Sequence, residues 1–394
     1  MNNNILHVGL DVGSTTVKIV VMNDSLETIY RDYRRHFSDT KNTVCNVLEE
    51  LNTNYPNTNF TIALTGSGAM SAANLLGLPF IQEVVSCKRA VEKYIPQTDV
   101  VIELGGEDAK IIYFDKSIEQ RMNGTCAGGT GAFIDQMASL LHTDTEGLNE
   151  LAKNYKTIYP IASRCGVFAK TDIQPLLNEG AAKEDIAISI FQAVVNQTIS
   201  GLACGRPIRG NVAFLGGPLN YLSELRNRFV ETLKLTDEQI IIPEEAHLLV
   251  AKGAALDSVS STLVSNAKLE AKIGVLRVSQ DTTTNPLKPL FHIPEEYDAF
   301  KKRHLKDTVK KGNLKDYKGD CFIGIDAGST TTKLVVIDKE GALLYSLYGS
   351  NEGSPLNSVV KALKKLYSEL PKEAIIRYSG VTGYGEKLIQ TALN

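Results

Sequence analysis

The stretch HVGLDVGSTTVKIVVMN at residues 7–23 decides the fold, because the chain contains it twice. Residues 322–338 read FIGIDAGSTTTKLVVID, and nine of the seventeen positions are identical at an offset of 315. A second pair follows, LTGSG at 64–68 and VTGYG at 381–385. A repeat of this kind indicates one structural unit present twice. We therefore expect a second module to begin near Cys321 and the sequence to be a fragment of a longer protein.

Short strands rich in β-branched residues alternate with helical patterns through the first module, which predicts an α/β fold. The strand candidates are ILHVGLD, VKIVVM, TIALTG, DVVIELG, AKIIYF and NVAFLGG. The helix candidates cover about 41–53, 83–95, 130–141, 166–178, 184–201, 219–233 and 246–257.

The predicted boundaries place a two-lobed module at 1–262. Lobe one covers about 4–98 plus a returning C-terminal helix, and lobe two covers about 99–245. Residues 266–320 lack the alternation, and 263–320 are predicted to be a linker, partly helical. Its basic run from Lys301 to Lys318 is interpreted as a solvated face, with a docking surface for an acidic partner as the alternative. Residues 321–394 begin the second module.

Composition fits a cytoplasmic protein that binds neither nucleic acid nor membrane. The hydrophobic content of 43% allows real cores, and the net charge of −3 supplies no attractive field for polyanions. No apolar run approaches the ~20 residues of a membrane helix. The N-terminus has no basic region before its apolar stretch, which argues against a signal peptide. None of the six cysteines falls in a CxxC motif.

The first glycine loop joins two strand candidates and carries three hydroxyl side chains. Glycine lets the backbone approach a phosphate closely, and successive amides can surround its oxygens. Asp11 is suited to hold magnesium through water. The predicted phosphate ligands are Gly13, Ser14, Thr15, Thr16 and Lys18. An ordinary hairpin turn, and for Lys18 an exposed strand lysine, are the alternatives.

Two more glycine sites follow, ELGGED at 103–108 and LGGP at 215–218. Their order resembles the phosphate-one, phosphate-two and adenosine signatures of the actin, sugar-kinase and chaperone ATPase superfamily. The resemblance implies an actin-like (ribonuclease H-like) two-lobed ATPase module. Glu103 and Asp108 join Asp11 as catalytic candidates. The further nucleotide-binding candidates are Gly105, Gly106, Glu107, Gly216, Gly217 and Pro218. The small residues of Ala251–Ala255 resemble the helix that returns beside the cleft.

Two cysteines precede predicted helices, Cys126 in NGTCAGGTGAF and Cys165 in ASRCGVFAKTD. A helix N-terminus lowers a thiol pKa, and the thiolate is the form that binds iron or zinc. Buried, inert cysteine is the alternative. We interpret the other four as structural: Cys45, Cys87, Cys204 and Cys321.

With DVGSTTVK, ELGGEDAK, CAGGTG, CGVFAKTD and FLGGPL together, the first 260 residues resemble the activator ATPases of 2-hydroxyacyl-CoA dehydratases and the ATPase subunits of benzoyl-CoA reductase. The tandem copy resembles the large double-module form. The resemblance implies that Cys126 and Cys165 of two subunits hold one four-iron four-sulfur cluster in a homodimer. Gly129 and Thr130, in the first cysteine motif, are carried over as cofactor-binding residues.

The resemblance implies an electron donor driven by ATP with Mg²⁺. Ferredoxin or flavodoxin would supply one electron, and an acyl-CoA dehydratase or reductase-type partner would receive it. Two residues depart from the smaller family members, which usually have Asp at the place of Glu103 and Gln at the place of Glu107. The rival interpretations are a kinase of a sugar or small acid and a non-catalytic, nucleotide-regulated scaffold.

Overall fold

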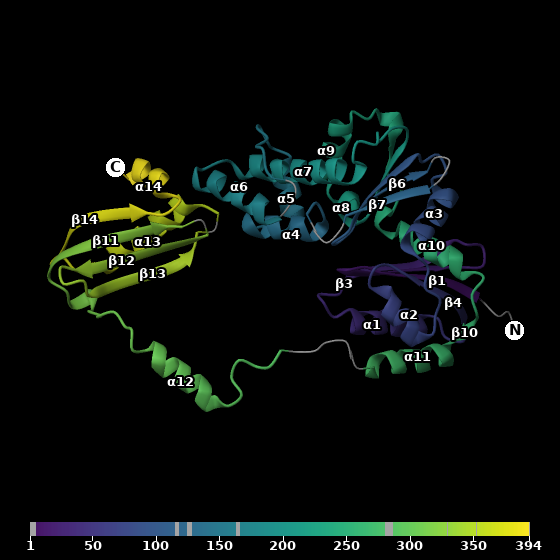
Figure 1. Cartoon of the computed structure of the whole chain (residues 1–394), viewed down its shortest axis with the longest axis horizontal. Coiled ribbons are helices and arrows are strands. Elements are labelled where there is room, and N and C mark those ends of the chain that lie inside the picture. The colour runs from purple at the N-terminus through teal and green to yellow at the C-terminus, as the bar shows by residue number, and fades with distance from the viewer. Residues whose placement is uncertain are drawn as a thin grey trace. The chain divides into compact units, whose positions relative to one another are not determined.

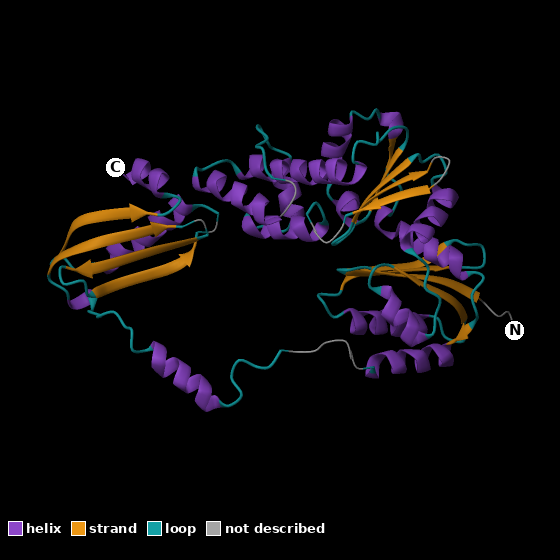
Figure 2. Ribbon diagram, viewed as in Figure 1, coloured by secondary structure: helices purple, strands orange, loops and turns teal. Residues whose placement is uncertain are grey.

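The computed structural model describes residues 5–114, 118–123, 128–162, 166–279, 287–328, 330–351 and 353–393. The chain divides into two compact units, which are described separately (Figure 1). The first comprises Met1–Ser139, Thr143–Ala169 and Ala187–Gln280. The second comprises Leu140–His142, Lys170–Ile186 and Asp281–Asn394. Each unit contains helices and sheets (Figure 2), so the predicted α/β class is confirmed.

Lobe one of the first unit is a five-stranded sheet of order β10-β4-β1-β2-β3. The two halves of the first sequence motif form its centre, where β1 pairs antiparallel with β2 and parallel with β4. The strands are β1 (Ile5–Val12), β2 (Thr16–Met22), β3 (Thr28–Arg35), β4 (Asn59–Thr65) and β10 (Val264–Ser265). Both faces of β1 are covered, since every residue after Ile5 is buried.

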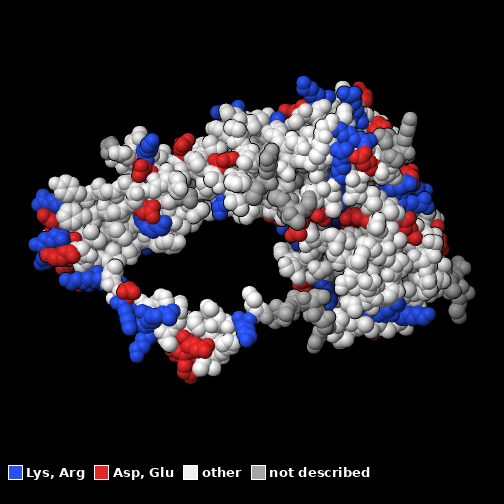
Figure 3. Space-filling model, viewed as in Figure 1, with Lys and Arg blue, Asp and Glu red and all other residues white. Residues whose placement is uncertain are grey.

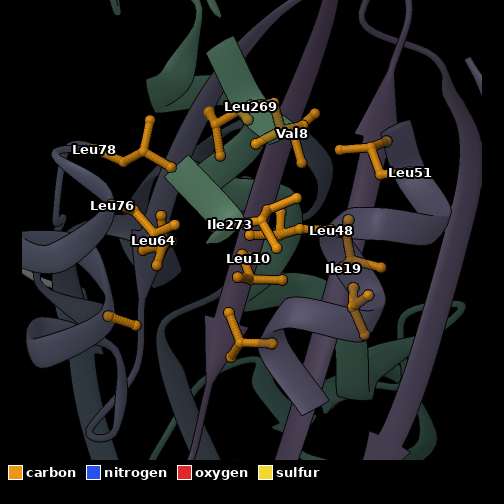
Figure 4. Close-up of a cluster of buried hydrophobic side chains, with 14 of the residues drawn as sticks. Val8, Leu10, Ile19, Leu48, Leu51, Leu64, Leu76, Leu78, Leu269 and Ile273 are labelled. Atoms are coloured by element: carbon orange, nitrogen blue, oxygen red, sulfur yellow. The ribbon is translucent and has the colours of Figure 1, made fainter. Parts of the chain in front are cut away.

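Helices cover both faces of this sheet. One face packs on α1 (Thr40–Asn54), α2 (Ala69–Leu76) and α11 (Asn266–Val278), and Leu10, Leu48 and Ile273 meet in their common core (Figure 4). The other face packs on α10 (Leu249–Ser258), whose Ala251 and Ala255 join Val20 and Met22. The linker predicted to begin at residue 263 therefore begins later in the structure, because residues 264–278 complete lobe one.

Lobe two is a five-stranded sheet of order β7-β6-β5-β8-β9. Its strands are β5 (Val100–Leu104), β6 (Ala109–Phe114), β7 (Ile118–Met122), β8 (Val212–Leu215) and β9 (Ile240–Ile241). Its helical segments are α4 (Gly131–Leu140), α5 (Thr145–Ala152), α7 (Lys183–Thr198), the π-helical η1 (Ile199–Ala203), α8 (Gly217–Tyr221), α9 (Ser223–Leu233) and the 3-10 turns η2 (Asp237–Gln239) and η3 (Ala246–Leu248). Most of α6 (Gly166–Asn178) belongs to the second unit.

Two helices join the lobes. The helix α3 (Glu83–Tyr94) packs on α10, and Cys87 and Val91 of α3 share a core with Leu215 of lobe two. Small residues allow this close approach: a Cβ atom on Gly253 would lie 1.8 Å from the Ser86 carbonyl oxygen, and one on Gly9 would lie 2.0 Å from that of Ala251. The small residues predicted at 251–255 therefore fix the distance between sheet and helix.

One helical run exceeds the apolar length expected from the sequence. Lys183–Ala203, which spans α7 and η1, has 21 residues and is long and apolar enough to cross a membrane by length and composition alone. However, 67% of its most apolar window is buried inside the protein. Such burial is typical of a core helix in a globular protein.

The second module repeats half of lobe one. Its sheet order is β13-β12-β11-β14, which corresponds strand for strand to β3-β2-β1-β4. The elements are β11 (Gly319–Ala327), β12 (Thr331–Asp338), β13 (Leu343–Ser350), β14 (Ala374–Thr382), α13 (Pro355–Glu369) and α14 (Glu386–Leu393). Buried and half-buried residues alternate along β11, unlike β1. This sheet is therefore covered mainly on the face that packs on the helices.

Between the two modules, α12 (Pro294–His304) has no buried residue. Its first turn is acidic and its last turn is basic, and both signs gather on this segment in Figure 3. The chain re-enters a core at Leu314, in the 3-10 turn η4 (Leu314–Asp316).

Candidate functional site

The first glycine loop is a tight turn between β1 and β2. The Gly13 amide donates to the Thr16 carbonyl at 2.9 Å, and the Asp11 and Lys18 backbones pair directly across the hairpin. Lys18 Nζ lies 2.6 Å from Asp11 Oδ2, and the side chains are only 12% and 2% exposed. Burial disfavours the Lys18 ammonium, but the carboxylates of Asp11, Glu103 and Glu83 together outweigh it and raise the Lys18 pKa. Lys18 is thus a buried, paired residue rather than an exposed strand lysine.

The second glycine loop repeats this geometry in lobe two. The Gly105 amide donates to the Asp108 carbonyl at 2.7 Å, and Glu103 of β5 pairs with Lys110 of β6 across the hairpin. Here the lysine is bound elsewhere: Lys110 Nζ lies 2.6 Å from Glu83 Oε1 and 3.9 Å from Glu103 Oε2. Glu103 is 4% exposed, and its Oε2 has no hydrogen-bond partner in the described part of the chain.

Glu83, in the first turn of α3, completes a buried charged group beneath the loops. Burial, followed by the negative charge of Glu103, raises the pKa of Glu83 to about 7. Burial disfavours the charge on Lys110 as well, but Glu103 and Glu83 raise the Lys110 pKa above its ordinary value. Three carboxyl groups, including Asp11, thus face two ammonium groups.

The third glycine site closes the cleft from the end of β8. Gly216 has φ +88, a left-handed conformation, and a Cβ atom there would lie 2.0 Å from the Leu104 carbonyl oxygen. Glycine is therefore required for the turn. Gly217 and Pro218 open α8, where proline at the first turn removes no helical hydrogen bond.

All three glycine sites contribute residues to one cleft between the two lobes. Seven predicted residues line it: Thr15, Thr16, Lys18, Gly105, Gly106, Gly217 and Pro218. The sequence did not single out the other nine: Tyr33, Arg35, Gly131, Ala132, Ile134, Asp135, Thr145, Tyr221 and Leu222.

The two lobes touch beside the cleft. A Cβ atom on Gly106 of lobe two would lie 2.0 Å from Thr15 Oγ1 of lobe one. Arg35 of β3 binds Asp135 of α4 through two contacts, Nη1 to Oδ2 at 2.8 Å and Nη2 to Oδ1 at 3.1 Å. Because both side chains are partly exposed, this pair contributes little stability and can open when the lobes move.

An aromatic group forms one wall. The rings of Tyr33 and Tyr221 lie 6.0 Å apart, and His247 of η3 packs on both at 5.3 and 5.1 Å. Burial and the nearby positive charge of Lys18 lower the pKa of His247 to about 4. The imidazole is therefore neutral near pH 7.

Several predicted residues lie away from the cleft lining. Asp11 and Glu103 are buried and absent from the residues that line it. Gly13, Ser14, Glu107, Asp108, Gly129, Thr130 and Gly216 are also outside the lining. Cys126 and Cys165 lie outside the described residues. Of the other cysteines, Cys45, Cys87 and Cys321 are buried, as a structural role requires, whereas Cys204 is exposed.

The described residues fit a magnesium nucleotide. The excess of buried carboxyl over ammonium groups and the unpartnered Glu103 oxygen favour a cation or an oriented water nearby. No group of three or more metal-ligating side chains occurs among the described residues. A Mg²⁺ ion held by nucleotide phosphates, water and one carboxylate needs no such group.

Comparison with known proteins places the first module among ATPases. Residues 8–257 match the BadF/BadG/BcrA/BcrD ATPase family. The 2-hydroxyisocaproyl-CoA dehydratase activator of Clostridioides difficile is 30% identical over 258 residues, covering 63% of this chain and 93% of that protein. The (R)-2-hydroxyglutaryl-CoA dehydratase activating ATPase of Acidaminococcus fermentans is 32% identical over 220 residues, covering 54% and 83%.

Two solved structures share the fold. Component A of the Acidaminococcus fermentans (R)-2-hydroxyglutaryl-CoA dehydratase superposes with a TM-score of 0.56 at 28% identity, covering 68% of this chain and 99% of that one. The activator of the 2-hydroxyisocaproyl-CoA dehydratase from Clostridium difficile, with bound ADPNP, has a TM-score of 0.55 at 25% identity and covers 71% and 100%. These similarities confirm the actin-like ATPase fold expected for the first module.

Proposed function

This chain belongs to the BadF/BadG/BcrA/BcrD ATPase family, and we propose that it is an ATP-dependent activator of an acyl-CoA dehydratase or reductase-type enzyme. The observation that carries the proposal is the meeting of three glycine sites at one cleft above buried Asp11 and Glu103. Two relatives, a 2-hydroxyisocaproyl-CoA dehydratase activator and an (R)-2-hydroxyglutaryl-CoA dehydratase activating ATPase, align along this module. The protein acts in the cytoplasm, where its thiols stay reduced.

In the cleft, Thr15, Thr16 and the backbone of Gly105–Gly106 hold the phosphates of ATP, since amides and hydroxyls donate to phosphate oxygens. Asp11 would hold the Mg²⁺ ion of the nucleotide through water. Glu103, which is buried and not part of the cleft lining, would accept a hydrogen bond from the attacking water through its unpartnered Oε2 when ATP is bound. Gly217 and Pro218 form the adenosine wall.

The proposed electron transfer to the partner enzyme depends on two cysteines that lie outside the described residues. The motifs around Cys126 and Cys165 support thiolate ligands, and α6 begins at Gly166, immediately after Cys165. Four thiolates from a homodimer would complete one four-iron four-sulfur cluster, which would supply a single electron. Ferredoxin or flavodoxin is the proposed source of that electron.

The experiment is anaerobic purification followed by iron, sulfide and size analysis. The proposal expects a brown dimer with about four iron atoms per dimer, as four-thiolate ligation requires. Cys165→Ser should lose the colour and much of the dimer, whereas Cys204→Ser, at an exposed cysteine outside the motifs, should keep both. A colourless monomer with sugar-dependent ATP turnover would contradict the activator function and favour a kinase.

A further inference from the structure

The two hairpins of the first module place their lysines differently. In lobe one, Lys18 binds the carboxylate opposite it, Asp11, at 2.6 Å. In lobe two, Lys110 stands 3.9 Å from the carboxylate opposite it, Glu103, and is bound by Glu83 at 2.6 Å. The backbone register is the same in both hairpins. The difference therefore comes from Glu83, which has no counterpart in the first hairpin's ion pair.

We infer that Glu83 and Lys110 are positioning residues: because Glu83 binds the Lys110 ammonium, Oε2 of Glu103 is left without a hydrogen-bond partner among the described residues and can accept a hydrogen bond from the attacking water. Lys110 is near enough to attract the carboxylate electrostatically without taking its Oε2 as a hydrogen-bond acceptor. Glu83 prevents the ammonium from moving onto Glu103, as Lys18 has done on Asp11. The inference rests on the proposed ATP hydrolysis in this cleft and deepens it.

The energetics favour this arrangement only as a set of three groups. Lys110 is 3% exposed, and a buried ammonium without a partner costs several kcal/mol. If Glu83 lost its charge, the nearest carboxylate for Lys110 would be Glu103. Contact between them would occupy the oxygen that the water needs. Hydrolysis would then slow, while the phosphate loops would still bind ATP.

Glu83→Gln tests this directly at pH 8, where the Glu83 carboxyl, with a pKa of about 7, is mainly ionised, because glutamine keeps the size of the side chain and removes the charge. We expect kcat for ATP hydrolysis to fall at least about tenfold, within the range that a positioned base contributes, with KM for ATP within about twofold. The matched control is Glu92→Gln, on the same helix in an exposed pair with Lys88, which should retain the wild-type kcat.

A second variant separates positioning from a general loss of structure. In Glu83→Gln/Lys110→Met no ammonium remains to cover Glu103, so kcat should rise above that of Glu83→Gln alone. Wild-type kcat in Glu83→Gln, or a double variant slower than the single one, would overturn the inference while leaving the proposed function standing. A wild-type chain that binds ATP without hydrolysing it would overturn both.

Discussion

The Lys18 ammonium lies 2.6 Å from the Asp11 carboxylate across the first hairpin, and the same seven-residue separation recurs twice. Lys110 faces Glu103 in lobe two, and Lys333 faces Asp326 at 3.0 Å in the second module. The first-module groups are buried, whereas the Lys333 and Asp326 side chains are 37% and 43% exposed. The repeat therefore preserves the pair, and the surrounding lobes decide whether it is desolvated.

Gly9 and Gly324 occupy equivalent positions in the two copies and should respond differently to alanine. A Cβ atom on Gly9 would lie 2.0 Å from the Ala251 carbonyl oxygen, so Gly9→Ala must displace α10. Overpacking typically costs about 1–3 kcal/mol, and a clash with backbone at this distance should lie at the upper end. On Gly324, the nearest atom to a Cβ would be Val335 Cγ2 at 3.2 Å, and the change should stay within about 1 kcal/mol.

Urea unfolding and ATP titration measure this difference. Gly9→Ala should unfold at lower urea and bind ATP more weakly, because α10 also packs on α3 beneath the cleft. Equal effects of the two substitutions would show that α10 does not set the geometry of lobe one.

His247 should make the first module sensitive to acid. Its pKa in the folded state is lowered to about 4 from 6.5, so the unfolded chain binds more protons between these values. The free energy of unfolding should therefore fall as pH drops from about 6.5 towards 4. His247→Gln cannot take up this proton, so its loss of stability over that range should be smaller. Urea midpoints measured at pH 7.5, 6.0 and 5.0 decide the matter, and parallel curves for both proteins would refute the role of His247.

Limited trypsin digestion should cut the chain first between Lys301 and Lys306. The α12 helix has no buried residue, so local unfolding there costs little. Further on, Leu343 donates to the Lys310 carbonyl at 2.8 Å and Leu314 is buried, which protects the later lysines. Mass spectrometry of the first fragments gives the answer. An initial cut within residues 5–279 would contradict it.

The repeat and the glycine motifs predicted the α/β class and the three sites that meet at the cleft. They succeeded because glycine turns after strands are local in sequence. Lys110 also had a local signal, its position seven residues after Glu103, which matches that of Lys18 after Asp11. Glu83 had none, because only the packing of α3 beneath the β5–β6 hairpin brings it to Lys110.

Two other features depend on tertiary structure alone. Arg35 and Asp135 are one hundred residues apart and meet only when the lobes fold together. The helix α11 lies in the stretch that was predicted to be a linker, and its Leu269, Ile273 and Leu276 become core residues only against α1 and α2. Sequence periodicity cannot reveal which distant face a helix will cover.

We expect ATP to bind in the first module alone. The second module has a phosphate loop at Asp326–Thr331, but this chain has no second copy of ELGGED or FLGGPL. One loop without an adenosine wall leaves most of the ligand in water, so it should bind weakly.

Calorimetric titration with ATP and Mg²⁺ tests this claim most directly. We expect one ATP per chain for the wild type, one for Asp326→Ala, and no magnesium-dependent binding for Asp11→Ala. Two ATP per chain, falling to one in Asp326→Ala, or unchanged affinity in Asp11→Ala, would contradict the account.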